Sequence, residues 1–299
     1  DKAGFGFDDY LEKGVYRAVE KTLEQAGTDH LNAVGYCIGG TLLGAALAHM
    51  GACDDKRVAP ATFFAPDVNN APMAMHRAQG RRVVFVEDGH LVAAQGKIEH
   101  RVPLAEVPIT RNGTIGFQVD NVMASVAAAW AVGIDWDRIR VGLKTFVGES
   151  DNAPGRFNVF DYRGATVIAD YGHNPDAIAA LANAVEAMPA KRRSVVISGA
   201  GDRRDQDITQ QTQILGKAFD DVLLYQDQCQ RGRADGEVLA LLRRGLDGAT
   251  RTSHVEEING EFVAIDRALS RLEAGDLCLI LIDQVDEALA HIARRVAEG

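Results

Sequence analysis

Apolar and polar positions follow two kinds of spacing in the first 65 residues. Residues 8–26 carry apolar side chains three or four positions apart with charged side chains between them, which predicts an amphipathic helix. Short apolar runs at residues 31–36 and 61–66 predict strands, and the Ala- and Leu-rich stretch 41–50 predicts a helix between them. This order of elements indicates part of an α/β sheet.

Residues 67–80 mix polar and apolar side chains with several chain-breaking residues, and no regular element is predicted there. Residues 81–104 alternate between apolar and polar positions around Asp88-Gly89, a pair typical of a hairpin turn. Paired strands are therefore expected on either side of this turn. Two helices are predicted after it, at residues 120–132 and 135–146.

From about residue 151 strands and helices are predicted in alternation. Two apolar runs flank Arg163-Gly164 and predict a hairpin. Further strands are predicted at residues 194–198, 221–225 and 277–282, with helices at residues 176–188, 208–219, 236–246, 262–272 and the C-terminus. This alternation is typical of an α/β fold with a mostly parallel sheet and helices on both faces.

Composition narrows the class of protein. The chain has 299 residues, of which 46% are hydrophobic and 25% charged, as in a globular protein with room for two domains. Its net charge of −10 argues against a protein that binds duplex nucleic acid, although it leaves room for a local basic pocket. The longest apolar run, residues 277–282, is far shorter than the ~18 residues of a membrane span. We therefore expect neither a nucleic-acid nor a membrane partner.

The lack of a signal peptide and the scattered cysteines of this sequence favour a cytoplasmic location. The chain has no signal peptide and does not begin with Met, so we expect a piece of a longer protein. Its four cysteines are scattered, with no CxxC pair and no zinc spacing, and no metal site is assigned to them. Reduced thiols in a cytoplasm are the simplest interpretation.

Cys37 lies in a segment that resembles a nucleophile elbow. In LNAVGYCIGGTLLGAALA, Gly35 and Gly39 flank it two positions away, and a predicted helix follows. Residues 1–64 resemble the polyhydroxyalkanoate synthases, acyltransferases of the α/β-hydrolase type that use a cysteine in such a box. No later histidine lies in a setting similar to that family's, so we expect Cys37 to be catalytically idle. Polyester synthesis through Cys37 is the alternative hypothesis.

A second resemblance covers the rest of the chain. It is carried by the motifs HRAQG, GFQVDNVMASVAAAWAVG, APGRFNVF, ATVIADYGHNPDAI, VVISGAGDRRDQDI and RGRADGEV, in this order. On these motifs, residues 61–299 resemble the C-terminal part of the cyanophycin synthetases, which is related to the Mur ligases. The resemblance implies a remnant of the Mur ligase central domain at residues 65–150 and a Rossmann-like Mur ligase C-terminal domain at residues 151–299. Residues 1–64 are then expected to be a separate α/β-hydrolase-like fragment.

The same resemblance implies an activity. Mur ligases are ATP-dependent enzymes that form amides, in which ATP phosphorylates a carboxylate and an amine attacks the acyl phosphate. In the cyanophycin synthetases this half is implied to add arginine to the aspartate side chains of the polymer. ATP, Mg²⁺, arginine and the aspartate–arginine polymer are therefore the expected cofactors and partners, and a homo-oligomer is also considered.

Five residues are assigned to the nucleotide by this resemblance. Asp170 ends a predicted strand, where ligands bind in open α/β sheets, and would contact the ribose. His173 would either contact the ligand or pack its loop. Arg156 would donate to the phosphates, unless it is a surface arginine before a strand. Gln118 and Asn121 would frame adenine through their amides, unless Asn121 or its neighbour caps a helix.

The residues after Asp170 predict the start of a helix. Asn174 is a favourable N-cap residue, and Pro175 is favourable at the first helical position. Gly172 departs from the family's usual alanine, which predicts a looser loop at this point.

Three residues are assigned to the substrate, namely Asp202, Arg203 and Arg231. The segment SGAGDRRD comes after a predicted strand, and its glycines permit a tight turn at the carboxyl edge of the sheet. Asp202 or Asp205 would then pair with an arginine substrate, and Arg231 and Arg233 are weaker candidates. A solvated cluster of charges is an equal alternative.

A phosphate loop, G-x-x-x-x-G-K-[ST], is missing from the sequence. Neither Gly-Lys pair, at residues 96–97 and 216–217, is followed by Ser or Thr. Without such a loop the γ-phosphoryl charge lacks its usual cradle. We therefore expect a ligase fragment that is inactive or nearly so alone, joined near residues 61–67 to the hydrolase-like piece. A non-catalytic module that binds nucleotide or polymer is the third hypothesis.

Overall fold

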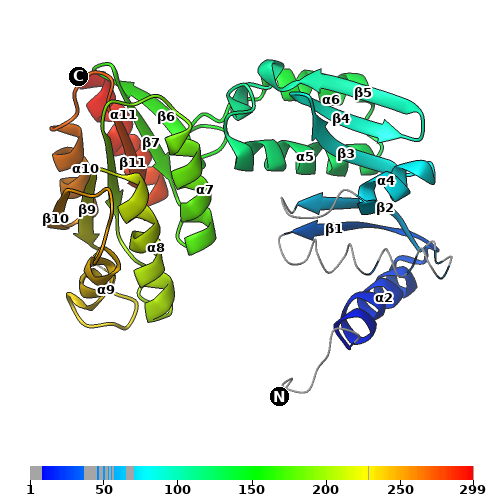
Figure 1. Ribbon diagram of the computed structural model, residues 1–299, viewed down its shortest axis with the longest axis horizontal. Helices are drawn as coiled ribbons and strands as arrows, with labels where there is room; N and C mark the ends of the chain where they lie inside the picture. The colour runs from blue at the N-terminus through cyan, green and yellow to red at the C-terminus, as the bar shows by residue number, and fades with distance from the viewer. Residues whose placement is uncertain are drawn as a thin grey trace. The chain divides into compact units, whose positions relative to one another are not determined.

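The chain divides into two compact units, Asp1–Phe146 and Val147–Gly299. A computed structural model describes most of both units (Figure 1). The described residues are 9–36, 46, 50, 53, 55, 57–64, 71–227 and 229–298. Cys37 and most of the helix predicted at residues 41–50 lie outside them, so the structure does not describe the predicted elbow.

The N-terminal unit begins with the helix predicted at residues 8–26. It consists of a π-helical segment, η1 (Tyr10–Tyr16), that continues as α2 (Arg17–Ala26). Two parallel strands come next, β1 (Leu31–Tyr36) and β2 (Val58–Phe64), which confirms both predicted strands with a shift of the second. The buried side chain of Val19 packs with Val58 in a small core beside this pair.

The rest of the N-terminal unit contains a three-stranded antiparallel sheet and several helices. The sheet confirms the predicted hairpin, since Asp88 and Gly89 take the left-handed backbone conformation that its tight turn needs. Helices of this unit pack on the sheet through buried aliphatic side chains. The elements are β3 (Arg82–Glu87), β4 (His90–Gln95), β5 (Ile98–Pro103), α4 (Ala71–Ala78), η2 (Leu104–Glu106), η3 (Pro108–Thr110), α5 (Gly116–Ala131) and α6 (Trp136–Thr145).

A six-stranded sheet forms the centre of the C-terminal unit, in the order β10-β9-β8-β11-β7-β6. Only β6 is antiparallel to its neighbour, so the predicted α/β fold with a mostly parallel sheet is confirmed. β7, β8, β9 and β11 are largely or wholly buried, as strands covered on both faces should be. The strands are β6 (Asn158–Tyr162), β7 (Ala165–Asp170), β8 (Arg193–Ile197), β9 (Asp221–Gln226), β10 (His254–Asn259) and β11 (Leu277–Leu281).

Helices cover both faces of this sheet (Figure 1). α10 and α11 pack on one face, where Val167, Val196 and Ile280 join their core. Successive strand residues point to opposite faces, so Ile168, Val195 and Leu279 face the other layer. The five helices are α7 (Pro175–Glu186), α8 (Asp205–Ala218), α9 (Glu237–Gly245), α10 (Glu261–Leu269) and α11 (Val285–Glu298).

The strand order determines where a ligand site is expected in this unit. β11 lies between β7 and β8, although it comes last along the chain. The connections that leave β7 and β8 lead to α7 and α8, whereas the one that leaves β11 leads to α11 on the other face. Such a reversal opens a crevice at the carboxyl ends of the strands, which is where open α/β sheets bind ligands.

Candidate functional site

Asp170, the last residue of β7, lies at this edge and is 7% exposed. Burial raises the pKa of its carboxyl to about 6, against the opposing effects of the Phe157 amide, the Arg156 charge and the Gly172 amide. The Phe157 amide donates to its Oδ2 at 2.8 Å. Asp170 is therefore held in one orientation at the end of its strand.

The PGRF segment folds back onto the end of β7. Phe157 takes a left-handed backbone conformation, with φ of 54°, which is rare for an aromatic residue. The buried amide of Asn158 organises the turn, since its Oδ1 accepts from the Gly155 amide at 2.7 Å and its Nδ2 donates to the Ala153 carbonyl at 2.9 Å. This geometry leaves Arg156 exposed and its charge close enough to Asp170 to lower the carboxyl pKa.

His173 lies in the loop between β7 and α7, and its side chain is 13% exposed. Its Nδ1 lies 2.9 Å from the Tyr171 carbonyl, and its ring packs on the Tyr171 ring with centroids 4.3 Å apart. Its Nε2 lies 3.4 Å from Asp283 Oδ1. The histidine therefore packs its loop and also reaches a carboxylate that comes after β11.

A charged cluster lies where β7, β8 and β11 end. Arg231 Nη2 lies 3.2 Å from Asp283 Oδ1, and Arg231 Nη1 lies 3.5 Å from Asp202 Oδ1. Asp283 lies just after β11, Asp202 after β8, and His173 after β7. The cluster thus joins a cation, two carboxylates and an imidazole drawn from three strand ends and the loop after β9. We call Asp202, Arg231, Asp283 and His173 the edge cluster.

Two other arginines of this region differ in how they are held. Arg233 has its donors occupied: Nε donates to the Gly201 carbonyl at 2.7 Å, Nη2 to the Arg203 carbonyl at 2.7 Å, and ion pairs join it to Asp205 and Glu237. It therefore fastens two loops together. Arg203 has an exposed side chain at the same edge.

The sequence suggested that Gly201 permits a tight turn, but the structure shows that a glycine is needed here because another backbone segment lies very close. A Cβ on this residue would lie 2.1 Å from the Gln230 carbonyl oxygen, which is far too close. Its backbone conformation is not left-handed. The glycine therefore permits the loop that carries Asp202 to touch the loop that carries Arg231.

Gln118 and Asn121 lie on α5 in the N-terminal unit, while the other site residues lie in the C-terminal unit. The two amides contact each other, since Asn121 Nδ2 donates to Gln118 Oε1 at 3.2 Å. Gln118 is buried and Asn121 is exposed. The helix begins at Gly116, so the alternative in which Asn121 or Asp120 caps it is wrong.

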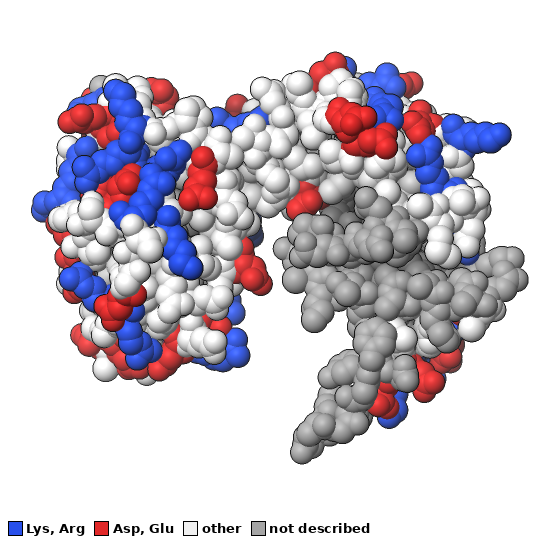
Figure 2. Space-filling model, viewed as in Figure 1, with Lys and Arg blue, Asp and Glu red and all other residues white. Residues whose placement is uncertain are grey.

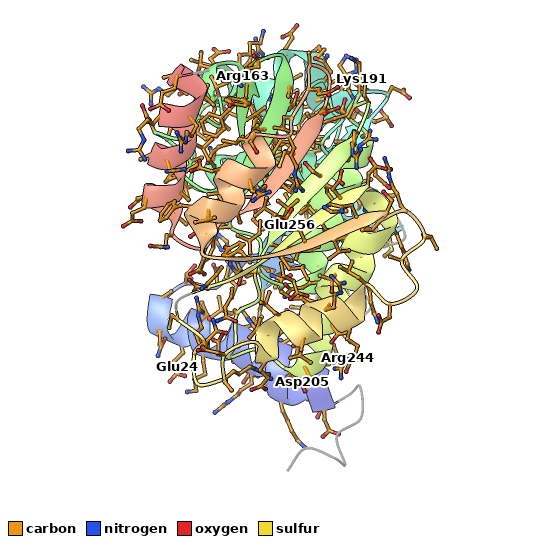
Figure 3. The ribbon with its side chains drawn as sticks, turned by 90° about the vertical axis from the view of Figure 1, so that its left-hand side faces the viewer. Glu24, Arg163, Lys191, Asp205, Arg244 and Glu256 are labelled. Carbon is orange, nitrogen blue, oxygen red and sulfur yellow. The ribbon has the colours of Figure 1, made fainter. Side chains whose placement is uncertain are left out.

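Charged side chains are unevenly distributed over the surface of the C-terminal unit. A local basic region is compatible with the negative net charge of the whole chain. Figure 2 shows Lys and Arg side chains gathered on the visible face of this unit. In Figure 3, Arg163 and Lys191 lie at the end where the parallel strands begin, and Asp205 lies towards the other end. Acidic and basic residues of the edge cluster therefore sit at the end opposite to Lys191.

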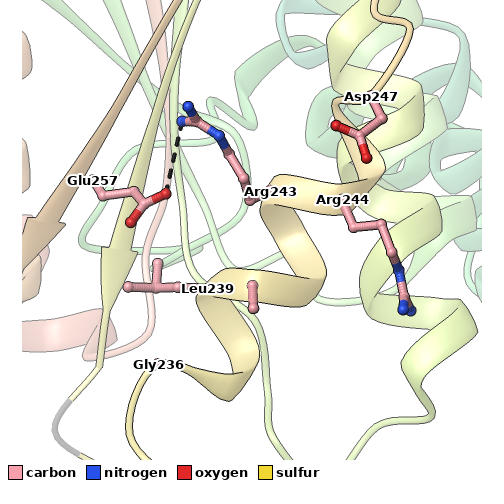
Figure 4. Close-up of a pocket in the computed structure, with 7 residues that line it drawn as sticks. Gly236, Leu239, Arg243, Arg244, Asp247 and Glu257 are labelled. Carbon is pink, nitrogen blue, oxygen red and sulfur yellow. Dashed lines mark ion pairs between the residues drawn. The ribbon is translucent and has the colours of Figure 1, made fainter.

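A surface hollow lies apart from the edge cluster, along α9 (Figure 4). An ion pair of 3.7 Å between Arg243 and Glu257 bridges it, and none of the residues predicted for the site lines it. Its lining residues are Gly236, Leu239, Ala240, Arg243, Arg244, Asp247 and Glu257.

Neither a metal site nor a membrane span is found in the described part of the chain. No group of three or more His, Cys, Asp or Glu side chains there is arranged to hold a metal ion. No helix among the described residues is both long and apolar enough to cross a bilayer.

The core of the C-terminal unit matches a known family. Residues 155–281 match the model of the Mur ligase, glutamate ligase domain. The chain contains a Mur ligase C-terminal domain. Asp170, His173, Asp202 and Arg231 all lie within the matched part of this Mur ligase domain.

Curated relatives extend the match beyond the Mur ligase domain. The cyanophycin synthetase of Crocosphaera subtropica is 29% identical over 290 residues, covering 96% of this chain and 33% of that protein. The cyanophycin synthetase of Synechocystis sp. is 30% identical over 246 residues, covering 82% of this chain and 28% of that protein. The chain is thus homologous to cyanophycin synthetases over most of its length, and it spans about a third of theirs or less.

Solved structures agree on the fold. The structure of E. coli FolC in complex with ADP has a TM-score of 0.57, is 21% identical, and is matched over 80% of this chain and 55% of that chain. A UDP-N-acetylmuramoyl-L-alanyl-D-glutamate–2,6-diaminopimelate ligase has a TM-score of 0.51 at 18% identity over 96% of this chain and 63% of that one. At such identities the likeness concerns the fold alone.

The expected hydrolase-like fragment at residues 1–64 is not confirmed. The alignment with the Crocosphaera protein covers 96% of the chain, so it must include most of these residues. The described part of this segment is also tied to the residues that come after it, because Arg81 Nη1 donates to the Val58 carbonyl at 2.8 Å. The resemblance to polyhydroxyalkanoate synthases receives no support from the comparisons.

Proposed function

We propose that this chain is part of an ATP-dependent amide ligase of the cyanophycin synthetase type, which joins arginine to aspartate side chains of a polymer. The edge cluster carries the proposal, because it places opposite charges at the ligand-binding edge of a Mur ligase C-terminal domain. Homology to cyanophycin synthetases over most of the chain supports the choice of this ligase type.

The reaction consists of two displacements. A carboxylate oxygen of the acceptor attacks the γ-phosphorus of ATP, so that an acyl phosphate forms and ADP leaves. The amine nitrogen of arginine then attacks the acyl carbon, the amide bond forms, and inorganic phosphate leaves as the nitrogen loses a proton. Both steps need charged groups that hold anionic and cationic substrates in position.

Arg156 and Asp170 of the C-terminal unit are assigned to the nucleotide. Arg156 is exposed beside the end of β7, where its guanidinium is free to approach phosphate oxygens. Asp170 is held beside it by the Phe157 amide and would accept from a ribose hydroxyl. Gln118 and Asn121 on α5 are assigned to the base by the resemblance alone, since each amide can both donate and accept.

The edge cluster is assigned to the incoming amino acid. The Asp202 carboxylate is 57% exposed, and its contact with Arg231 is long at 3.5 Å, so a guanidinium or ammonium group can compete for it. Asp205 is held by Arg233 at 2.8 Å and is the weaker candidate. Arg231 would donate to the substrate carboxylate, because a guanidinium binds carboxylates with paired donors.

The isolated chain is expected to have little or no ligase activity of its own. Its sequence lacks a phosphate-loop motif, and Mg²⁺ remains an expectation that rests on the family.

Binding of a fluorescent ATP analogue tests the nucleotide part of the proposal. We expect Arg156→Ala to weaken the affinity about five- to tenfold, as loss of one charged hydrogen bond to phosphate should. Arg163→Ala is the matched control, because Arg163 lies at the other end of β6 with its guanidinium over the Tyr162 ring. Equal effects of the two substitutions, or no binding by the unaltered chain, would contradict the assignment of Arg156.

Incubation with ATP, arginine and an aspartate polymer tests the activity. Binding of arginine and nucleotide without incorporation of arginine is the expected result. Measurable incorporation would contradict the expected inactivity, while absence of all binding would leave only a non-catalytic domain. Hydroxyacyl-CoA turnover that disappears in Cys37→Ser would instead favour the polyester synthase hypothesis.

A further inference from the structure

Glu261 is a buried carboxylate with an unusual set of partners. It is the first residue of α10, directly after β10 and Gly260, and it is 3% exposed. β10 lies at the far edge of the sheet, three positions from β11. Glu261 nevertheless contacts the residues just after β11, because α10 crosses back over the sheet.

Glu261 contacts Asp283 of the edge cluster and Gln284, the residue that follows it. Its Oε1 accepts from the Asp283 amide at 2.8 Å, and its Oε2 accepts from the Gln284 amide at 3.2 Å and from Gln284 Nε2 at 3.1 Å. Burial raises the pKa of Glu261, and these three donors oppose that rise. A carboxylate removed from water in this way needs such donors to remain charged.

Neighbouring contacts fix the same short segment of backbone. The Ile282 amide donates to the Asp170 carbonyl at 2.9 Å, and the Tyr225 hydroxyl donates to the Leu281 carbonyl at 3.2 Å. With Glu261 of α10 holding the next two amides, residues 281–284 are each fastened to another part of the C-terminal unit. The side chain of Asp283 therefore leaves a fixed backbone towards Arg231 and His173.

We propose that Glu261 is a positioning residue of the edge cluster: it holds the Asp283 backbone so that the Asp283 carboxylate meets Arg231 Nη2 and His173 Nε2. The hydrogen bonds of Glu261 itself go to Asp283 and Gln284 rather than to those two side chains. The proposal rests on the proposed function of the edge cluster as the site for the incoming amino acid. It predicts that a change at Glu261 alters groups with which Glu261 forms no hydrogen bond.

The test uses the whole chain and the nuclear magnetic resonance signals of the His173 ring and the Arg231 side chain. These signals are assigned from His173→Gln and Arg231→Lys, and Asp283→Asn gives their positions without the carboxylate. In Glu261→Gln, the NH2 of the new side-chain amide is itself a donor, so this side chain cannot accept from both backbone amides as the carboxylate does. We therefore expect both signals to move towards their positions in Asp283→Asn. Glu257→Gln makes the same chemical change on β10 outside the edge cluster and should leave both signals in place.

A purely structural role for Glu261 gives a different result. The Asp283 and Gln284 amides would then exchange faster in Glu261→Gln while the His173 and Arg231 signals stay at their original positions, and this would overturn the proposal. Should Glu261→Gln fail to fold, Glu261→Asp keeps the charge but is too short to reach both amides. The same shift of signals is then expected, and unchanged signals would again overturn the proposal.

A binding measurement separates this inference from the proposed function. If the unaltered chain binds arginine, Glu261→Gln should weaken that binding about tenfold and Glu257→Gln should not change it. If the unaltered chain binds no arginine, the proposed function of the edge cluster fails. The shift of the His173 and Arg231 signals would still decide whether Glu261 positions Asp283.

Discussion

Burial of the Asp170 carboxyl makes the stability of the C-terminal unit depend on pH. Its pKa in the folded state is about 6, against an ordinary value of 3.8. The folded state therefore binds the proton more tightly than the unfolded state, so its stability should fall as pH rises from about 4 to above 6. The decrease from this one group is at most about 3 kcal/mol.

Urea unfolding of the C-terminal unit at pH 4.5 and pH 7.5 checks this expectation. The decrease in the free energy of unfolding between the two pH values should become smaller in Asp170→Asn. Asp161→Asn, which alters an exposed carboxylate on the neighbouring strand, should keep the original decrease. An unchanged pH dependence in Asp170→Asn would show that the carboxyl titrates normally.

Substitution by alanine should destabilise the protein more at Gly201 than at Gly172. A Cβ at Gly201 would collide with the Gln230 carbonyl oxygen, which is part of the backbone, whereas a Cβ at Gly172 would meet the end of the Leu181 side chain at 2.8 Å. We expect Gly201→Ala to cost about 2–3 kcal/mol and Gly172→Ala about 1 kcal/mol or less. Thermal unfolding of both variants measures this, and equal costs would contradict the close approach of the two loops.

The sequence predicts some site residues from local rules and misses others. Asp170 is predictable because it ends an apolar strand, and the same rule applies to Asp283, which comes directly after residues 277–282. The roles of Arg233 and Glu261 depend on which loops meet in space. No local pattern could reveal them, because each contacts backbone groups more than 20 residues away in the chain.

Helix α7 begins as the sequence predicts. Asn174 Oδ1 accepts from the Ala177 amide at 2.8 Å, and Pro175 occupies the first helical position. We expect Asn174→Ala to lower the free energy of unfolding by about 1 kcal/mol. Asn183→Ala, an exposed change inside the same helix, should alter stability by less than about 0.5 kcal/mol. Similar effects in chemical denaturation would mean that the cap contributes nothing.

The strand β10 and the helix α4 escape prediction for identifiable reasons. β10 has the sequence HVEEIN and lies at the edge of the sheet, where its mostly polar side chains lack the continuous apolar run of a buried strand. α4 begins with Ala71 and Pro72, and a proline indicates a chain break in most settings although it is favourable in the first turn of a helix.

The order of strands could not be read from the sequence. Each strand of the C-terminal unit except β10 is predictable, but local pattern does not say that β11 inserts between β7 and β8. That insertion brings Asp283 beside His173 and Arg231. The N-terminal unit also has a contact that local pattern could not predict. Arg81 donates to the Val58 carbonyl across the junction expected near residues 61–67.

Calorimetric titration of the whole chain with arginine decides whether the edge cluster binds the incoming amino acid. We expect saturable binding that Asp202→Asn weakens about tenfold, the effect of losing one charged contact. Asp205→Asn should change it little, because Asp205 is already paired with Arg233. Binding that both substitutions weaken equally, or no binding by the unaltered chain, would show that the edge cluster is not the site for arginine.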